Sequence, residues 1–224
     1  MSLDQKDIFG TRSSLERLVR HAALQAGQTV LDVGTGTGAA AFELWRAGGH
    51  VVAVDVSRPT WVDAEPGPAF ACADAARLPF ASGSFARVVA RRVGHHLLDL
   101  EAGLSEMVRV LAPGGRLIID DRIVSQEQRS LVDELERLRD ASHVQCLTED
   151  EWRERIEELG LIDVRCEAYA RRIPCGAYFP CASSDSRIAR RLAELGPEDR
   201  HLLEIDEASS RLTQRFSVLS GRRA

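Results

Sequence analysis

A glycine-rich loop between a short apolar stretch and a helix-forming stretch constrains this chain more than any other feature. Residues 30–42 read VLDVGTGTGAAAF, and the loop contains Gly34, Gly36 and Gly38. Glycines let a backbone approach a ligand closely, and the N–H groups that open the next helix point to the same place. This layout is typical of nucleotide-binding turns, and it predicts a strand, a ligand-binding loop and a helix in that order.

The loop by itself is compatible with two cofactors. Gly34, Gly36 and Ala39 fit the dinucleotide pattern, which tolerates alanine at its third position. Asp32, however, stands two residues before Gly34 and would repel a pyrophosphate. The same carboxylate suits the ammonium and sulfonium groups of S-adenosylmethionine. S-adenosylmethionine is therefore the favoured ligand, and NAD remains the alternative.

Three acidic residues stand at the ends of successive predicted strands. They are Asp32, Asp55 and Asp74. In open α/β folds the carboxyl ends of parallel strands form the edge at which ligands bind. Asp55 can accept both hydroxyls of a ribose, and Asp74 can accept a hydrogen bond from an adenine amino group. Together with the glycine loop, the three acids indicate a nucleotide-like ligand.

The composition is that of an ordinary globular chain. Its 224 residues suffice for one α/β domain, and 44% of them are hydrophobic. The net charge of −5 gives no indication of a nucleic-acid partner. We expect no membrane span, because no apolar run approaches the roughly 20 residues required. Five cysteines without C-x-x-C spacing, and the absence of a signal-peptide pattern, predict free thiols and a cytoplasmic protein.

Apolar strand patterns alternate with amphipathic helix patterns along the chain. This alternation predicts an α/β fold with a doubly wound, Rossmann-like parallel sheet and helices on both faces. Strands are expected at 29–33, 50–55, 69–73, 85–90, 116–120, 161–169 and 211–221. Helices are expected at 11–25, 36–47, from 99, 126–139, 148–160, 185–195 and 198–209. Residues 171–183 are predicted to be irregular, because they contain two prolines and a glycine.

Several segments resemble the class I S-adenosylmethionine-dependent methyltransferases, in particular the branch of ubiquinone and menaquinone C-methyltransferases. The segments that carry the resemblance are LDVGTGTG, ADAARLPF (73–80), SFARVVARRVGHHL (84–97) and VLAPGGRLIIDD (110–121). RDASHVQCLTEDEW (139–152) also resembles a bacterial subgroup of this branch. The resemblance implies a seven-stranded sheet whose last strand is antiparallel. With it, we expect one domain over residues 1–224, with cap or lid insertions at about 122–147 and 171–210.

The resemblance also implies roles for residues around the cofactor. The methionine part would lie near the first group, the ribose on Asp55, and adenine near Val56 and the residues after the third strand. The implied cofactor residues are Asp32, Gly34, Thr35, Gly36, Asp55, Val56, Ala73, Asp74, Ala75 and Arg91, whose backbone faces the methionine part.

Two departures from this pattern are visible. Ala86 replaces the aspartate that usually follows the phenylalanine of the fourth strand. Only 16 residues separate Asp55 from Cys72, and Pro59, Pro66 and Pro68 are among them. The usual second helix is therefore expected to be shortened or lost. The adenine side of the pocket is then either more open or covered by Trp61.

Histidines near the same edge are candidates for proton transfer. Methyl transfer from a sulfonium needs alignment in a dry pocket, and a base only when the acceptor must lose a proton. His95 and His96 follow the fourth strand and are the candidate catalytic residues, although both can equally be structural. Asp120 and Asp121 end the fifth strand and can touch an acceptor or order the loop. His143 can reach over the pocket or end a helix.

The segment from 171 to 181 offers candidate acceptor contacts. Tyr178 and Phe179 can form an aromatic wall, and Arg171 or Arg172 can pair with an acidic acceptor or lie on a solvated loop. Cys175 and Cys181 lack the spacing of metal ligands, and we predict no metal site.

Three functions follow from these observations. The first is methyl transfer from S-adenosylmethionine to a small organic molecule, which fits the acid-flanked loop. The second is an NAD-dependent oxidoreductase. The third is a cofactor-binding protein without transferase activity, which Ala86 and the short 56–68 segment leave open.

Overall fold

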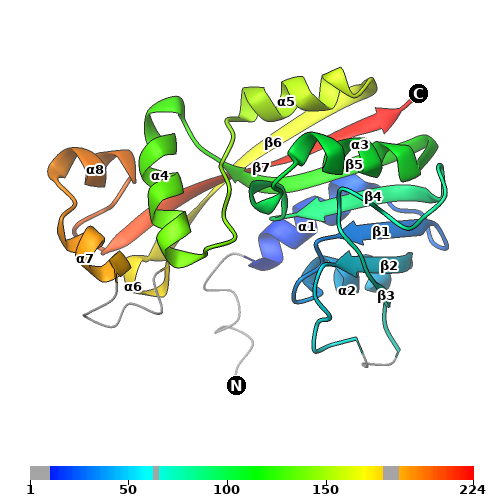
Figure 1. Cartoon of the computed structure of the whole chain (residues 1–224), viewed down its shortest axis with the longest axis horizontal. Coiled ribbons are helices and arrows are strands. Elements are labelled where there is room, and N and C mark those ends of the chain that lie inside the picture. Colours follow the sequence, from blue (N-terminus) through cyan, green and yellow to red (C-terminus); the bar gives the residue numbers. More distant parts are fainter. Residues whose placement is uncertain (1–10, 63–65, 179–186) are drawn as a thin grey trace.

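The computed structural model describes residues 11–62, 66–178 and 187–224 (Figure 1). Phe179 and Cys181, two residues singled out from the sequence, lie outside the described residues. A seven-stranded sheet in the order β3-β2-β1-β4-β5-β7-β6 forms the centre. β7 is antiparallel to both β5 and β6, while β1 to β5 pair in parallel. The predicted seven-stranded sheet with an antiparallel last strand is confirmed.

The strands differ in length in a way that matters for the site. β6 and β7 contain 14 and 13 residues, whereas the first four strands contain four to seven. β6 and β7 therefore extend beyond the parallel part of the sheet. The strands are β1 (Thr29–Val33), β2 (His50–Asp55), β3 (Ala69–Cys72), β4 (Phe85–Arg91), β5 (Leu111–Ile123), β6 (Leu161–Pro174) and β7 (Arg211–Arg223).

Helices cover both faces of the sheet because strand side chains alternate between them. On one face, Leu18 of α1 and Leu44 of α2 pack with Val30. On the other, Met107 of α3 and Trp152 of α5 pack with Leu31. These helices are α1 (Thr11–Ala22), α2 (Ala39–Arg46), α3 (Leu100–Val110) and α5 (Glu149–Glu158). A short 3-10 helix, Gly94–His96, leads from β4 towards α3.

A further group of helices packs beside the extended ends of β6 and β7, at the left of Figure 1. Leu131 and Leu135 of α4 share a separate hydrophobic cluster with Leu195 and Leu203. We call this group, together with the strand ends it covers, the cap. Its helices are α4 (Gln126–Arg139), α6 (Cys175–Tyr178), α7 (Arg187–Ala193) and α8 (Pro197–Leu202). No helix in these described ranges is long and apolar enough to cross a membrane.

Several predicted boundaries are wrong. β5, for example, runs from Leu111 to Ile123 and not only over 116–120, and two further errors concern the cap. The segment expected to be irregular from 171 continues β6 to Pro174, because it pairs with β7 up to Pro174 and Arg211. Buried Arg171 and Ile173 alternate there with exposed Arg172, which is a strand pattern carried by arginines. The helix expected over 198–209 ends at Leu202, and the Asp206 carboxylate instead accepts hydrogen bonds from the N–H groups that follow it.

A buried carboxylate links the end of β1 to the glycine loop. Asp32 is 1% exposed, and its Oδ2 accepts a hydrogen bond from Thr35 Oγ1 at 2.7 Å. Burial raises the pKa of Asp32 to about 6, although the Thr35 hydroxyl and the charge of Arg91 act in the opposite direction. The bond fixes the first turn of the glycine loop to the strand that precedes it.

Replacing this acid by Asn is expected to change how stability depends on pH. A carboxyl with a raised pKa stabilises the fold fully below its ordinary value of 3.8 and loses that contribution as the pH rises through 6. The difference in unfolding free energy between the wild type and Asp32→Asn should therefore fall by about 3 kcal/mol over this range. Urea unfolding at a series of pH values measures it, and a difference independent of pH would contradict the account.

Candidate active site

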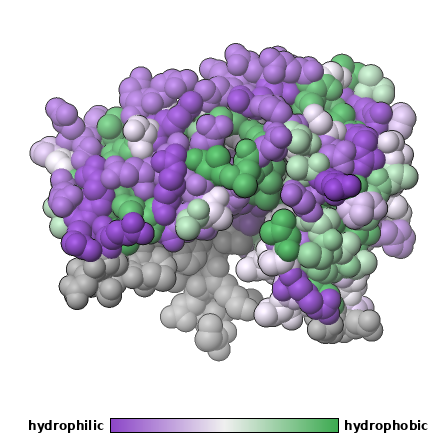
Figure 2. Space-filling view, viewed as in Figure 1, coloured by the Kyte–Doolittle hydropathy of each residue, from purple (hydrophilic) through white to green (hydrophobic). Residues whose placement is uncertain are grey.

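A pocket of about 500 Å³ lies at the carboxyl ends of the parallel strands. Its walls come from the glycine loop after β1, from the residues that follow β2, β3 and β4, and from Ser142. The segment between β4 and α3 contributes apolar side chains, including Val93, Leu97 and Leu98. Hydrophobic residues also reach the surface between α3 and α4 in Figure 2, surrounded by hydrophilic ones. The pocket is large enough for a nucleoside-sized ligand.

The glycine loop keeps its backbone close to the pocket because its glycines adopt conformations that other residues avoid. Gly34 has φ of 66°, and a Cβ on this residue would lie 2.3 Å from a methyl of Val93. Gly36 has φ of 49° and donates its N–H to Asp55 Oδ2 at 2.9 Å. The end of β2 therefore holds the loop, and the loop and Asp55 form one wall.

Seven of the predicted cofactor residues line this pocket, and three do not. Asp32 and Thr35 are buried beneath the loop, and the Arg91 side chain points to Asp120 and Ser14 instead. Arg92, the next residue, takes the place in the lining that the sequence suggested for Arg91. The lining residues are Gly34, Gly36, Asp55, Val56, Ala73, Asp74 and Ala75.

Trp61 supports the loop from outside the pocket. Its Nε1 donates to the Gly36 carbonyl at 2.9 Å, and its ring packs edge-on against Phe42 and Phe70. Gly38 has φ of 77°, and a Cβ there would lie 2.8 Å from the indole. The described residues between β2 and β3 contain no helix, as the short spacing predicts. Trp61 does not line the pocket and therefore does not cover its adenine side.

Of the two adjacent histidines, His96 reaches the pocket. His96 Nδ1 lies 2.9 Å from Ser142 Oγ, and that hydroxyl donates to Asp140 Oδ1 at 2.6 Å. Since the hydroxyl proton is used on Asp140, His96 Nδ1 must be the donor to Ser142, and Nε2 keeps its lone pair. Burial, followed by the charge of His95, lowers the pKa of His96. Ser142 and Asp140 were not singled out individually from the sequence, although both lie in the segment RDASHVQCLTEDEW.

His95 lies behind His96, with 4.1 Å between the ring centroids. Its Nδ1 contacts the buried carboxylate of Asp121, which also accepts the His95 N–H at 3.3 Å. Burial acts to raise the pKa of Asp121, but the charge and hydrogen bond of His95 outweigh it and hold that pKa low. Asp121 therefore orders the loop after β4 and does not line the pocket.

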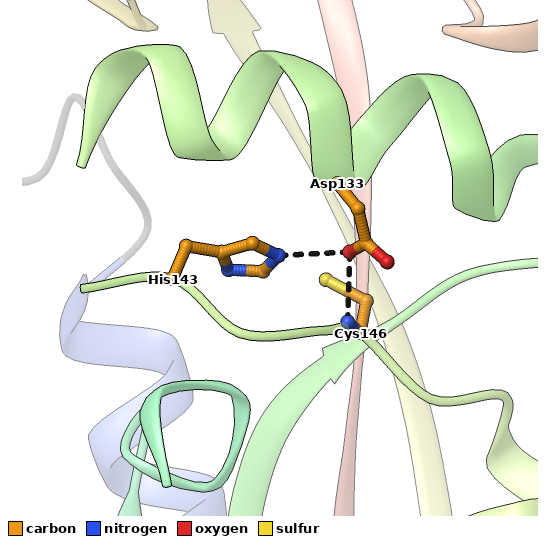
Figure 3. Close-up of side chains that lie close together, drawn as sticks. All are labelled: Asp133, His143 and Cys146. Atoms are coloured by element: carbon orange, nitrogen blue, oxygen red, sulfur yellow. Dashed lines mark hydrogen bonds and ion pairs between the residues drawn. The ribbon is translucent and has the colours of Figure 1, made fainter. Parts of the chain in front are cut away.

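The third histidine is held inside the cap, as Figure 3 shows. Asp133 Oδ1 accepts hydrogen bonds from His143 Nε2 and from the Cys146 N–H, both at 2.8 Å. The three residues have the composition of a metal site. Burial raises the pKa of the Cys146 thiol, however, and the carboxylate oxygen is already shared by two donors. The cluster ties residues 143–146 to α4, which places Ser142 opposite His96.

The comparisons with known proteins agree with this geometry. A family model described as "Methyltransferase domain" matches residues 31–119, which run from the glycine loop to the end of the parallel sheet. Demethylmenaquinone methyltransferase of Beutenbergia cavernae is 41% identical over 113 residues, 47% of each chain. 27-O-demethylrifamycin SV methyltransferase of Amycolatopsis mediterranei is 30% identical over 158 residues, 65% of this chain and 58% of that protein.

The fold extends beyond the matched sequence. The crystal structure of YcgJ from Bacillus subtilis superposes with a TM-score of 0.82 at 22% identity, covering 95% of this chain and 98% of that one. The chain spans about half the length of the first curated relatives that it matches. The shared segment contains the glycine loop and the ends of β2 and β4. Residues 31–119 thus form a methyltransferase domain of the class I S-adenosylmethionine-dependent type.

Proposed function

We propose that this protein transfers the methyl group of S-adenosylmethionine to a small organic acceptor, and that His96 accepts the proton an acceptor must lose. One observation carries the proposal. A single pocket is lined by the glycine loop, by Asp55 at the end of β2 and by His96, whose pKa is lowered. The cofactor supplies an activated methyl group, and the protein supplies alignment and proton transfer.

The cofactor half of the pocket fits a nucleoside with a positively charged tail. Asp55 presents a carboxylate at the strand end, and its two oxygens match a vicinal diol. Asp74 and Asp99 add negative charge to the lining. The dinucleotide alternative is disfavoured, because NAD-binding sheets of the doubly wound type are parallel in the order 3-2-1-4-5-6. Here the antiparallel β7 stands between β5 and β6.

The His96 contacts suit a general base. The hydrogen bond from Nδ1 to Ser142 leaves Nε2 free to take a proton, and the lowered pKa keeps the ring neutral at neutral pH. The Ser142 hydroxyl and the Asp140 carboxylate to which it donates both favour the positive charge that His96 would gain. An acceptor with an acidic O–H, N–H or C–H group fits this arrangement.

A small acceptor is supported by the names of the relatives and by the net charge. Two relatives are named as methyltransferases of a demethylated menaquinone and of a demethylated rifamycin. The net charge of −5 does not favour RNA or DNA as the acceptor.

Cofactor binding should depend on Asp55. Asp55→Asn keeps an oxygen for the Gly36 N–H but removes the charge and one acceptor, so the dissociation constant for S-adenosylhomocysteine should rise about 10- to 100-fold. Calorimetric titration measures this, with Asp150→Asn on the exposed side of α5 as the matched control. Tight NAD binding without S-adenosylhomocysteine binding would contradict the proposal. Normal cofactor affinity without turnover of any acceptor would favour the cofactor-binding alternative.

The proton-accepting role of His96 predicts its tautomer. Long-range proton–nitrogen correlation spectra should show the proton of neutral His96 on Nδ1, and Ser142→Ala should weaken that preference. On any acceptor that is turned over with loss of a proton, His96→Gln should lower kcat by about 10²-fold or more. His201→Gln, on exposed α8, is the control. A His96 that carries its proton on Nε2 would rule out the role.

A further inference from the structure

Two arginines beside the pocket form no ion pair with an acidic side chain in the described ranges, although the charge of Asp120 acts on both. They are Arg92, which follows β4, and Arg171 on β6. Both guanidinium groups lie against the ring of Phe216 on β7, with Cζ at 4.2 and 5.5 Å from its centroid. The two segments are far apart in the sequence, and the long β6–β7 pair brings them to one place.

Arg171 is unusually buried for an unpaired cation. It is 7% exposed, and its Nε has no hydrogen-bond partner in the described part of the molecule. Burial, followed by the charge of Arg92, lowers the pKa of Arg171 to about 10. Burying a charge without a counterion is costly, and arginines this buried are normally paired. The neighbouring Arg172 is exposed and pairs with Asp206, so a paired and an unpaired arginine stand next to each other on the same strand.

Arg92 is positioned by a strained backbone. Its φ of 56° lies in the left-handed region, which is uncommon for a residue with a side chain. The Arg92 N–H donates to the Asp120 carbonyl at 2.8 Å, which holds the residue in this conformation. Its Nε and one terminal nitrogen are buried without partners, and the residue lines the pocket. Strain of this kind is concentrated at binding sites.

The nearest acid, Asp120, is shared between several arginines. Its Oδ2 lies 3.3 Å from Arg91 Nε, its Oδ1 accepts a hydrogen bond from Tyr169 at 2.8 Å, and its charge also acts on Arg92 and Arg171. One carboxylate therefore faces three guanidinium groups. Asp121 faces His95 instead. Arg92 and Arg171 therefore leave an excess of positive charge beside the pocket, in surroundings where charges interact strongly.

We propose that Arg92 and Arg171 bind a carboxylate or phosphate group of the methyl acceptor. This inference rests on the proposed methyl transfer. It makes the substrate class an anionic small molecule, held so that its other end reaches the cofactor pocket that Arg92 also lines. Tyr169 and Phe216 stack with 5.3 Å between their ring centroids, which provides an apolar floor beside the anion.

The cofactor itself has a carboxylate, and the experiment must separate the two anions. Protein saturated with S-adenosylhomocysteine is titrated with benzoate, with phenyl phosphate and with the neutral benzamide, at constant ionic strength. Both anions should bind and benzamide should not. Arg171→Gln should weaken the binding of the anions at least about tenfold. Arg172→Gln, the matched control with an exposed guanidinium, should leave it unchanged.

Each result decides between distinct accounts. If anions bind only without S-adenosylhomocysteine, the arginines hold the cofactor carboxylate and the acceptor proposal is overturned. Equal binding by the wild type and Arg171→Gln also overturns it. Arg92→Gln provides a second variant should Arg171→Gln fail to fold. S-adenosylhomocysteine binding by the wild type is recorded first, so a failure of the proposed function is seen separately.

Discussion

The pairing of β7 between β5 and β6 is the constraint on which the site depends. β7 contacts β5 from Arg116 to Ile123 and β6 up to Pro174, so one continuous sheet extends from the nucleotide-binding half to the cap. Phe216 lies opposite Arg122 on one side and Tyr169 on the other. This register places Phe216 below the end of β4, where Arg92 and Arg171 both lie against its ring.

Charge is distributed unequally across the two halves of the pocket. The strand ends proposed to face the nucleoside carry Asp55 and Asp74, whereas Arg92 lines the pocket elsewhere and Arg171 lies near Arg92 on the same Phe216 ring. In the absence of a ligand, the buried acid Asp32 and the unpaired buried arginines each lower the free energy of unfolding. Such local costs are typical of binding sites, where a ligand of opposite charge offsets them.

The cap supports the His96 side of the pocket through its own core. Asp133 on α4 holds His143 and Cys146, and the same loop presents Ser142 to His96. The hydrogen bond from Val144 N–H to the His95 carbonyl, at 2.9 Å, closes the connection between loop and histidines. Through this loop, α4 of the cap holds the Ser142 hydroxyl against His96.

The strand ends of the parallel half could be predicted because their patterns are local. The VLDVGTGTG turn and the acid at the end of β2 follow directly from strand, glycine and carboxylate spacing. The roles of Arg92, Ser142 and the end of β6 could not be predicted in this way. Arg91 and Arg92 are identical residues, and only the positive φ of Arg92 selects which one faces the pocket. The position of Ser142 depends on the conformation of the 140–146 loop, which no periodic sequence pattern predicts. The end of β6 was not predicted because it contains Pro174, and this part of the strand is stabilised by its pairing with β7.

A crystal structure with S-adenosylhomocysteine tests the central claim most directly, because it locates the ligand rather than inferring it. The account predicts ribose hydroxyls on the Asp55 carboxylate, adenine between Val56 and the residues after β3, and the sulfur directed towards the space between His96 and Arg92. A ligand bound elsewhere on the chain, or one whose ribose does not meet Asp55, would contradict it.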